Sequence, residues 1–362
     1  MKIPVRNLYY LLAYAWGHAD AAREREADEA PIDTLPDLLA FVLAKRVSAL
    51  LKRGMDRSYA EERLVLAGVR GKLDLSTTVK RNLLAQARTA CSVEEFRHDI
   101  LQNQILRKTL KNLLALPRLD PEVRASVGLV YRKLEEISEI KIRRSSFRRV
   151  RIHRNNRPYR FLMNLCSLIH DSLHLDEAGA AHFADLRDRR NEMARLFESF
   201  VANFYAEEQA IYKVSNQSSM KWFGARSAVE EELALLPDMR PDVILVSHDR
   251  RVILDAKFYV EALKLGWHGG RRIHSGHLYQ LFSYLENRNL HVPDGPVHEG
   301  MLLYPVVSQP FRHDYELKGH RIQVRSIDLD QDWRGIHDDL LRMIGCDLLE
   351  TAQRSRPQAR PA

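Results

Sequence analysis

The sequence has few cysteines and no long apolar run. Its three cysteines, Cys91, Cys166 and Cys346, are far apart and none belongs to a CxxC pair, so neither a disulfide framework nor a zinc knuckle is predicted. No apolar segment approaches the roughly 20 residues that span a bilayer, and the N-terminal residues do not resemble a signal peptide. We therefore expect a cytoplasmic protein with no membrane partner.

A P-loop of the form GxxxxGK[ST] is also absent, so this chain is not expected to hydrolyse a nucleotide itself. Basic residues, by contrast, are abundant. Lysine and arginine number 56 against 48 aspartates and glutamates, which gives a formal net charge of +8 over 362 residues. A basic excess favours a nucleic-acid partner, because phosphate neutralisation drives sequence-independent affinity.

Apolar spacing predicts an α/β fold, in which helices flank a short mixed sheet (mixed α+β). The helical period is found in eight segments: 5–16, 37–52, 100–116, 121–140, 158–173, 188–210, 276–287 and 333–349. Alternating residues with two glycines predict a small strand pair in "RLVLAGVRGKLDLSTTV". We expect a mainly helical N-terminal domain over 1–150, an α/β domain over 151–349 and a disordered tail over 350–362.

The segment "KIRRSSFRRVRIHRNNRPYR", residues 141–160, holds one lysine and eight arginines without an acidic residue. A solvated loop is one interpretation, and an acidic face on a protein partner is another. A run of a single sign without counter-charge favours phosphate contacts, so nucleic acid is our preferred ligand. The candidate DNA-binding residues are Arg143, Arg144, Arg148, Arg149 and Arg151.

The stretch "RPDVILVSHDRRVILDAKFY", residues 240–259, predicts two apolar strands around the turn "SHDR". An antiparallel hairpin that pairs Val246 with Arg251 also sets Asp242 opposite Asp255. Lys257 points to the same face as Asp255, because strand side chains alternate. Two facing carboxylates repel unless a cation lies between them, and Mg²⁺ prefers such oxygen ligands. The pattern predicts metal-assisted phosphodiester hydrolysis, with Asp242, Asp255 and Lys257 as catalytic residues. A surface hairpin that carries ordinary charges is the other interpretation.

Two neighbouring helices offer further candidates. Glu198 lies at the border of the apolar face of "NEMARLFESFVANFYAEEQ", where it could join Asp242 and Asp255 as a metal ligand or simply face solvent. In "HLYQLFSYLEN", Gln280 and Tyr284 are four residues apart and share one helix face. They could hydrogen-bond a phosphate or the lysine, or occupy ordinary boundary positions.

With these residues in place, the chain resembles the McrC family, the nuclease subunit of the McrBC modification-dependent restriction system. The resemblance covers nearly the whole chain. It rests at the front on "IPVRNLYYLLAYAW", "GVRGKLDLSTTV" and "FRHDILQNQILRKTL", and at the back on "PDVILVSHDRRVILDAKFY", "HSGHLYQLFSYL" and "LLYPVV". The segment around residues 141–160 is more basic than this family leads us to expect.

The resemblance implies a two-part protein. Its N-terminal domain would dock on a McrB-like hexameric AAA+ GTPase, which binds the GTP, and would stimulate GTP hydrolysis. Its C-terminal domain would be a Mg²⁺-dependent PD-(D/E)xK endonuclease that cuts methylcytosine-containing double-stranded DNA. Carried onto this chain, the metal-binding aspartates are Asp242 and Asp255 and the catalytic lysine is Lys257. Gln280 and Tyr284 match a QxxxY helix of RecB-like relatives.

Two other functions stay open at this point. The chain could be a non-catalytic activating subunit of the AAA+ partner, although an intact set of Asp242, Asp255 and Lys257 argues against a decayed site. It could also be a stand-alone PD-(D/E)xK repair nuclease, although the long N-terminal half carries no catalytic pattern and favours a docking role. The sequence does not identify the residues that contact the partner; the stretch "LLKRGMDRSY" is our candidate, with Lys52 and Arg53 within it.

Overall fold

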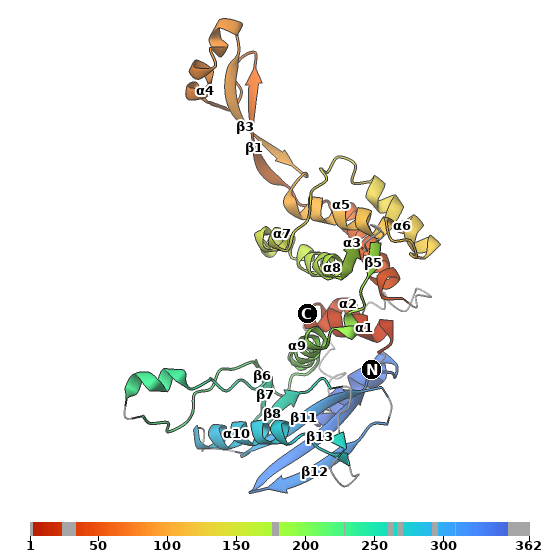
Figure 1. Cartoon of the computed structure of the whole chain (residues 1–362), viewed down its shortest axis with the longest axis vertical. Coiled ribbons are helices and arrows are strands. Elements are labelled where there is room, and N and C mark those ends of the chain that lie inside the picture. The colour runs from red at the N-terminus through yellow and green to blue at the C-terminus, as the bar shows by residue number, and fades with distance from the viewer. Residues whose placement is uncertain are drawn as a thin grey trace, which may run out of the picture. The chain divides into compact units, whose positions relative to one another are not determined.

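The computed structural model describes residues 3–23, 34–175, 181–227, 229–259, 264–265, 271–291, 296–307 and 309–346. The chain folds as two compact units (Figure 1). The helical unit comprises residues 32–184, and the sheet unit comprises residues 1–31 together with 185–362. The mixed α+β fold class is confirmed, while the tail expected over 350–362 lies outside the described residues.

The division of the chain differs from the expected boundary at residue 150. The N-terminal helix α1 (Val5–Ala15) packs on α9 (Arg190–Glu208) and so belongs to the sheet unit, where the rings of Tyr10 and Tyr14 contact Phe200. The helix α8 (Pro158–Ser172) packs instead with the helical unit. Both assignments arise because the apolar faces of these helices pack against residues that are far away in the sequence. Local periodicity cannot reveal such contacts.

Helices and a long arm make up the helical unit. Its main helices are α3 (Leu35–Arg53), α5 (Leu101–Leu114), α6 (Pro121–Arg132), α7 (Arg144–Arg149) and α8. The predicted helix over 121–140 ends early at Arg132, and Ser138 beyond it donates from its backbone and its hydroxyl to Asp99. A short hairpin follows α8, formed by β4 (Leu173–Leu175) and β5 (Ala181–Phe183).

The arm projects from the helices and is visible in Figure 1 as a long two-stranded ribbon. Its strands β1 (Ser58–Leu66) and β3 (Thr89–Arg97) pair antiparallel along nine residues. Its tip carries β2 (Lys72–Leu73), the helix α4 (Leu75–Lys80) and the short 3₁₀ helix η1 (Leu83–Gln86). The stretch predicted to form a strand pair supplies the end of β1 and β2, but these strands do not pair with each other: both pair with β3, and the residues after β2 form α4.

Asp56 anchors the base of the arm, within the stretch "LLKRGMDRSY". Its Oδ2 accepts hydrogen bonds from Gln102 at 2.9 Å and from Asn156 at 2.9 Å. Its backbone amide donates to the Tyr159 hydroxyl, which in turn donates to Asn103 at 2.6 Å. The family-like stretch "FRHDILQNQILRKTL" and the arginine-rich segment therefore meet where the arm begins. Because Asn103, Asn156 and Tyr159 are buried, these bonds fix the base of the arm against the helices.

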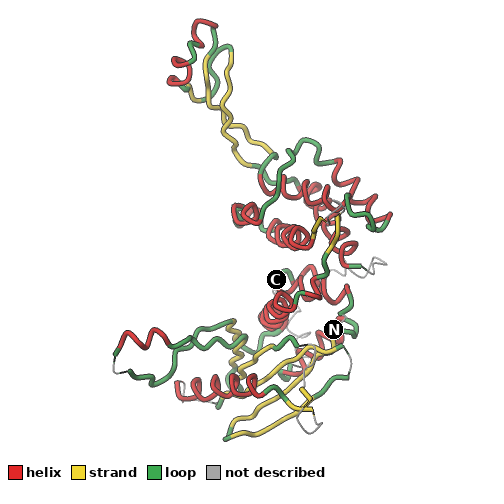
Figure 2. The backbone as a smooth tube through the Cα atoms, viewed as in Figure 1, coloured by secondary structure: helices red, strands yellow, loops and turns green. Residues whose placement is uncertain are grey.

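A six-stranded mixed sheet forms the centre of the sheet unit. Its strands are β6 (Lys213–Asn216), β7 (Val243–Val246), β8 (Arg251–Ala256), β11 (His298–Val306), β12 (Arg312–Leu317) and β13 (His320–Asp328), in the order β12-β13-β11-β8-β7-β6. The three central strands β8, β11 and β13 are parallel, and the outer pairings are antiparallel. In Figure 2 the strands of this sheet are the yellow segments beside the red helix α10. Parallel strands need a crossover, and α10 (Ser275–His291) supplies it between β8 and β11.

Helix α10 covers one face of this sheet. Leu281 and Leu285 of α10 pack against Ile253, Leu302 and Val324 in a core of fully buried side chains. Smaller elements complete the sheet unit: α2 (Ala19–Arg23), η3 (Leu186–Asp188), η4 (Glu230–Leu235), β9 (Lys264–Leu265), β10 (Arg271–Arg272) and α11 (Trp333–Met343). No helix in the described ranges is both long and apolar enough to cross a membrane.

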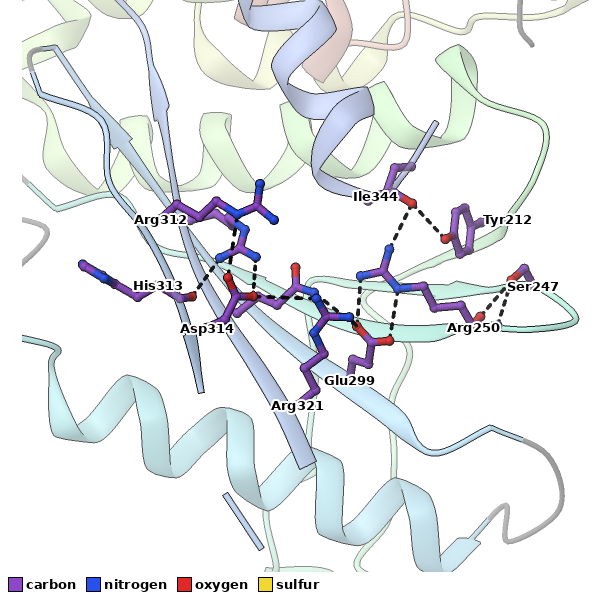
Figure 3. A network of polar contacts seen from close by, with 11 residues as sticks. Tyr212, Ser247, Arg250, Glu299, Arg312, His313, Asp314, Arg321 and Ile344 are labelled. Carbon is purple, nitrogen blue, oxygen red and sulfur yellow. Dashed lines mark hydrogen bonds and ion pairs between the residues drawn. The ribbon is translucent and has the colours of Figure 1, made fainter. Parts of the chain in front are cut away.

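Charged side chains hold the β7–β8 turn in place (Figure 3). The Arg250 guanidinium contacts Glu299 on β11 through two nitrogens, at 3.2 and 2.9 Å, and donates to the Ile344 carbonyl beyond α11 at 3.1 Å. Tyr212 donates to the same carbonyl at 2.9 Å. A paired arginine at a half-buried position is rigid because its planar fork is satisfied on both sides. The hairpin that carries Asp242 and Asp255 is therefore tied to the sheet at its turn.

Candidate active site

The register of the β7–β8 hairpin is the predicted one. Val246 pairs with Arg251 and Val243 pairs with Leu254. One step further along, Asp242 comes opposite Asp255, and the Asp242 Oδ2 accepts a hydrogen bond from the backbone amide of Ala256 at 2.8 Å. The two carboxylates that the sequence predicted to face each other are therefore adjacent at the open end of the hairpin.

Lys257 connects this pair of carboxylates to α10. Its Nζ lies 2.5 Å from Asp255 Oδ2 and donates to Gln280 Oε1 at 3.0 Å. Gln280 Nε2 donates to the Tyr284 hydroxyl at 2.7 Å, and that hydroxyl donates to the Arg240 carbonyl at 3.3 Å. The backbone amide of Lys257 donates to Leu303 of β11 at 2.8 Å. The structure thus brings the five predicted catalytic residues into one connected network.

Burial makes this network electrostatically unusual. Asp255 is 1% exposed, and burial raises its pKa above the ordinary value of 3.8, although Lys257 opposes the rise. Burial also raises the pKa of Asp242, and the neighbouring charge of Asp255 adds to the rise. Burial alone would lower the pKa of Lys257, yet the charge and hydrogen bond of Asp255 together with the charge of Asp242 outweigh burial, and the pKa is raised. Carboxyl groups that resist ionisation beside a charged amine are typical of functional sites.

The donor set of this site suits a hard divalent cation. Asp255 Oδ2 is buried and lies against the Lys257 ammonium, and the neighbouring Asp242 adds a second carboxyl group whose charge repels that of Asp255. Two adjacent carboxylates that disfavour each other's charge are the environment that Mg²⁺ relieves. The residues present therefore fit the ion that the sequence predicted.

Glu198 does not complete a three-carboxylate cluster. It is half-buried on α9, and burial raises its pKa while the charge of Lys257 lowers it. Across the described residues, no three histidine, cysteine, aspartate or glutamate side chains converge as a metal cluster. The predicted ligand set of Asp242, Asp255 and Glu198 is therefore not assembled in this structure. The Lys257 amine, rather than a third carboxylate, lies against Asp255 Oδ2.

The arginine-rich segment lies in the helical unit. All five predicted DNA-binding residues are exposed, as are the other three arginines of the segment. Helix α7 carries part of the segment, and its Arg144 pairs with Asp171 at 3.0 Å. The exposure of so many cations on one segment agrees with an anionic ligand but does not identify it.

Sequence reasoning missed the backbone groups that fix the site. The Ala256 amide orients Asp242, the Leu303 carbonyl holds Lys257, and the Arg240 carbonyl receives Tyr284. Main-chain groups leave no trace in residue identity, so only the strand register could have revealed them. The register assigns the first two contacts to the end of β8, where Ala256 pairs with Leu303 of β11.

Comparison with known proteins places this chain in a family. A family model described as the McrBC 5-methylcytosine restriction system component matches residues 5–305. The chain belongs to this McrBC family. It is 31% identical over 340 residues to the Type IV methyl-directed restriction enzyme EcoKMcrBC of Escherichia coli (strain K12), covering 94% of this chain and 96% of that protein. The resemblance noted from the sequence motifs is confirmed.

A solved structure supports the fold of this McrBC-family chain. The match is to a chain of the refined half-complex from the tetradecameric assembly of Thermococcus gammatolerans McrB AAA+ hexamers with bound McrC. The TM-score is 0.57 at 18% identity, over 94% of this chain and 76% of the matched chain. At this identity the likeness speaks for a shared fold.

Asp242→Asn is expected to stabilise the sheet unit at alkaline pH. Because burial raises the Asp242 pKa, the folded state keeps a proton that the unfolded chain has already lost. The stability contributed by the neutral carboxyl is present at acid pH and is lost as pH rises through the raised pKa. Asparagine mimics the neutral form and still accepts from Ala256, so the free energy of unfolding should rise by about 0.5–2 kcal/mol at alkaline pH and remain unchanged near pH 4.

Urea unfolding of wild type and Asp242→Asn across this pH range measures the effect. Asp249→Asn, an exposed position in the turn of the same hairpin, is the matched control and should change stability at neither pH. An equal gain in the free energy of unfolding at both pH values would show that burial does not destabilise the charged form of Asp242.

Proposed function

We propose that this chain is the endonuclease subunit of a McrBC-type restriction system. It hydrolyses phosphodiester bonds of methylcytosine-containing double-stranded DNA, with Mg²⁺, when assembled with a McrB-like hexameric AAA+ GTPase. The single observation that carries the proposal is the connected network of Asp242, Asp255, Lys257, Gln280 and Tyr284, which runs from the buried Asp255 to the exposed Gln280. A network that joins two carboxylates, an ammonium and an amide in this order matches the needs of phosphodiester hydrolysis.

Each side chain has a role that its contacts support. Asp242 and Asp255 would hold Mg²⁺, which when bound supplies charge stabilisation for the phosphate and a more acidic water. Lys257 lies against Asp255, so its ammonium would serve as a cationic donor toward a phosphate oxygen. Gln280 holds the ammonium from the other side, and Tyr284 orients Gln280. Glu198 is a weaker candidate ligand: the charges of Asp255 and Lys257 act on it, but it joins no three-carboxylate cluster in the described residues.

The tip of the arm is the proposed contact with the AAA+ partner. Large apolar side chains are exposed there in unusual number: Val69, Leu75, Val79 and Leu84. Exposed apolar clusters on a folded protein mark interaction sites. The GTP would be bound by the partner, since this chain has no P-loop. The earlier candidates Lys52 and Arg53 lie at the end of α3, beside the base of the arm rather than at its tip.

The arginine-rich segment is proposed as a second DNA contact, carried by the helical unit. Its exposed cations Arg143, Arg148, Arg149 and Arg151 would neutralise backbone phosphates without reading sequence. Recognition of the modified base would belong to the partner, as the family resemblance implies.

Plasmid cleavage with the reconstituted system tests the proposal. The chain, its AAA+ partner, GTP and Mg²⁺ are combined with methylated or unmethylated plasmid. We expect double-strand cleavage of the methylated plasmid alone, lost when the partner, GTP or Mg²⁺ is omitted. Cleavage of both plasmids without the partner would favour a stand-alone nuclease. Absence of cleavage, with GTP hydrolysis still stimulated, would favour a non-catalytic activating subunit.

A further inference from the structure

The connection between β6 and β7 projects past the sheet alongside α10 (Figure 1). Its two limbs are held together at the base, where Met220 and Met239 form an isolated antiparallel bridge. The indole of Trp222 donates to the Pro237 carbonyl at 2.9 Å, and Lys221 pairs with Asp238 at 2.7 Å. The base of this connection is therefore an ordered structure rather than a loose loop.

Asn287 of α10 fixes the backbone on both sides of Trp222. Its Oδ1 accepts from the Phe223 amide at 2.6 Å, and its Nδ2 donates to the Lys221 carbonyl at 2.9 Å. Asn287 follows Gln280 by seven residues and Tyr284 by three, so all three side chains share one face of α10. Only 8% of Asn287 is exposed, and its side-chain amide makes both of these hydrogen bonds. We call this pair of hydrogen bonds the Asn287 clamp. The same helix face thus positions the catalytic lysine and this segment.

The clamp presents two aromatic side chains to solvent. Trp222 is 42% exposed and Phe223 is 51% exposed, although their backbone is held rigidly. Folded proteins seldom leave two adjacent large rings open to water on a rigid support unless those rings meet a ligand. Neither residue is part of the catalytic network, and the solvent-facing part of each ring is available to a ligand.

Charge and position favour DNA as that ligand. The rings are flanked by the exposed cations Lys221 and Arg240, and the single carboxylate between them, Asp238, offsets only one of the two. The backbone of Arg240 accepts the hydrogen bond of Tyr284, so the segment is continuous with the catalytic network. Acidic residues gather further out, in η4, as Glu230, Glu231 and Glu232. The positive charge that would attract a polyanion is thus confined to the base of the β6–β7 connection, next to the catalytic residues.

We propose that Lys221, Trp222, Phe223 and Arg240 form an aromatic–basic platform that holds the DNA strand flanking the phosphodiester to be cleaved. The two cations contact backbone phosphates, and the two rings stack on a base or sugar of the same strand. This platform rests on the proposed function, since it deepens the account of how the nuclease site holds its substrate. Stacking on a rigid aromatic support is tolerant of sequence, which suits a nuclease whose partner recognises the modified base.

Binding of a fluorescent duplex to the full chain tests the platform apart from cleavage. Every variant carries Asp255→Asn, and anisotropy is recorded with the chain alone in Mg²⁺ at low salt. Trp222→Ala combined with Phe223→Ala should weaken DNA binding roughly tenfold or more. Lys221→Gln should lower the slope of log affinity against log salt by about one. Tyr315→Ala, a ring of matched exposure (41%) on the edge strand β12, is the control and should bind as the parent does.

Two additions keep the outcome decisive. Asn287→Ala releases the clamp but leaves both rings, so it should weaken binding by a smaller factor than loss of the rings. Assembly with the AAA+ partner is measured for the ring variant as well. Parent-like DNA affinity with weakened assembly would overturn the platform in favour of a protein-docking surface, and parent-like values of both would overturn it outright. Failure of the nuclease proposal is distinguishable, because it would appear as intact cleavage by Asp255→Asn with the wild-type platform.

Discussion

Asp255→Asn is expected to abolish DNA cleavage by the assembled complex while leaving the partner's GTP hydrolysis intact. Asparagine keeps the shape of the side chain but removes the charge that pairs with Lys257 and would ligate Mg²⁺. Loss of a metal ligand forfeits several kcal/mol of transition-state stabilisation, so cleavage should slow by at least about a thousandfold. Stimulation of GTP hydrolysis is assigned to the arm, which Asp255 does not touch.

The measurement is the initial rate of plasmid cleavage beside the rate of GTP hydrolysis in the same reaction. Asp249→Asn is the matched control, because it makes the same chemical change at an exposed position of the same hairpin. The control should cut at the wild-type rate. Wild-type cleavage by Asp255→Asn would remove this hairpin from the catalytic mechanism.

Polar substitution of the arm tip is expected to impair binding of the AAA+ partner and the stimulation of its GTP hydrolysis, both of which Asp255→Asn should leave intact. Leu75→Ser, Val79→Ser and Leu84→Ser together remove three exposed apolar side chains from α4 and η1. The N-cap of α4 survives, because Asp74 still accepts from the Thr77 amide at 3.0 Å. If these residues are anchors for the partner, each contributes about 1–2 kcal/mol, so the affinity for the AAA+ partner should fall roughly a hundredfold or more.

Partner binding by analytical ultracentrifugation, together with stimulated GTP hydrolysis, checks this outcome. Both should be lost, and cleavage should be lost with them, while DNA binding by the chain alone is unchanged. Leu129→Ser, at an exposed apolar position on α6, is the control and should behave as wild type. Undiminished stimulation by the triple variant would move the contact with the partner elsewhere on the chain.

The catalytic hairpin could be predicted from sequence because its geometry is local. A four-residue turn fixes the pairing of Val246 with Arg251, and strand alternation then sets Asp242, Asp255 and Lys257 in place. The relation of Gln280 to Tyr284 is equally local, because four residues make about one helical turn. The link from Lys257 to Gln280 crosses from β8 to α10, and only the compatible chemistry of the two side chains hinted at it.

The arrangement of the units could not be predicted in the same way. The stretch "IPVRNLYYLLAYAW" reads as a helix at the front of an N-terminal domain, yet Asn7 donates to the carbonyls of Leu329 and Gln331 at 2.8 and 2.7 Å. Contacts across more than 300 residues leave no periodic signal. The position of Glu198 could not be predicted for a related reason, since the helical pattern placed it at the border of an apolar face but could not fix its distance from the aspartates, and it forms no three-carboxylate cluster with them in the described residues.

The most direct test of the central claim is to count the divalent cations bound at the hairpin. Electron paramagnetic resonance of Mn²⁺ titrated into the full chain, with a short duplex present, reports bound ions without any need for cleavage. The account predicts bound Mn²⁺ in the wild type and its loss in the double variant Asp242→Asn with Asp255→Asn, with Asp249→Asn as control. The same bound Mn²⁺ in wild type and double variant would contradict a metal-dependent nuclease site at this hairpin.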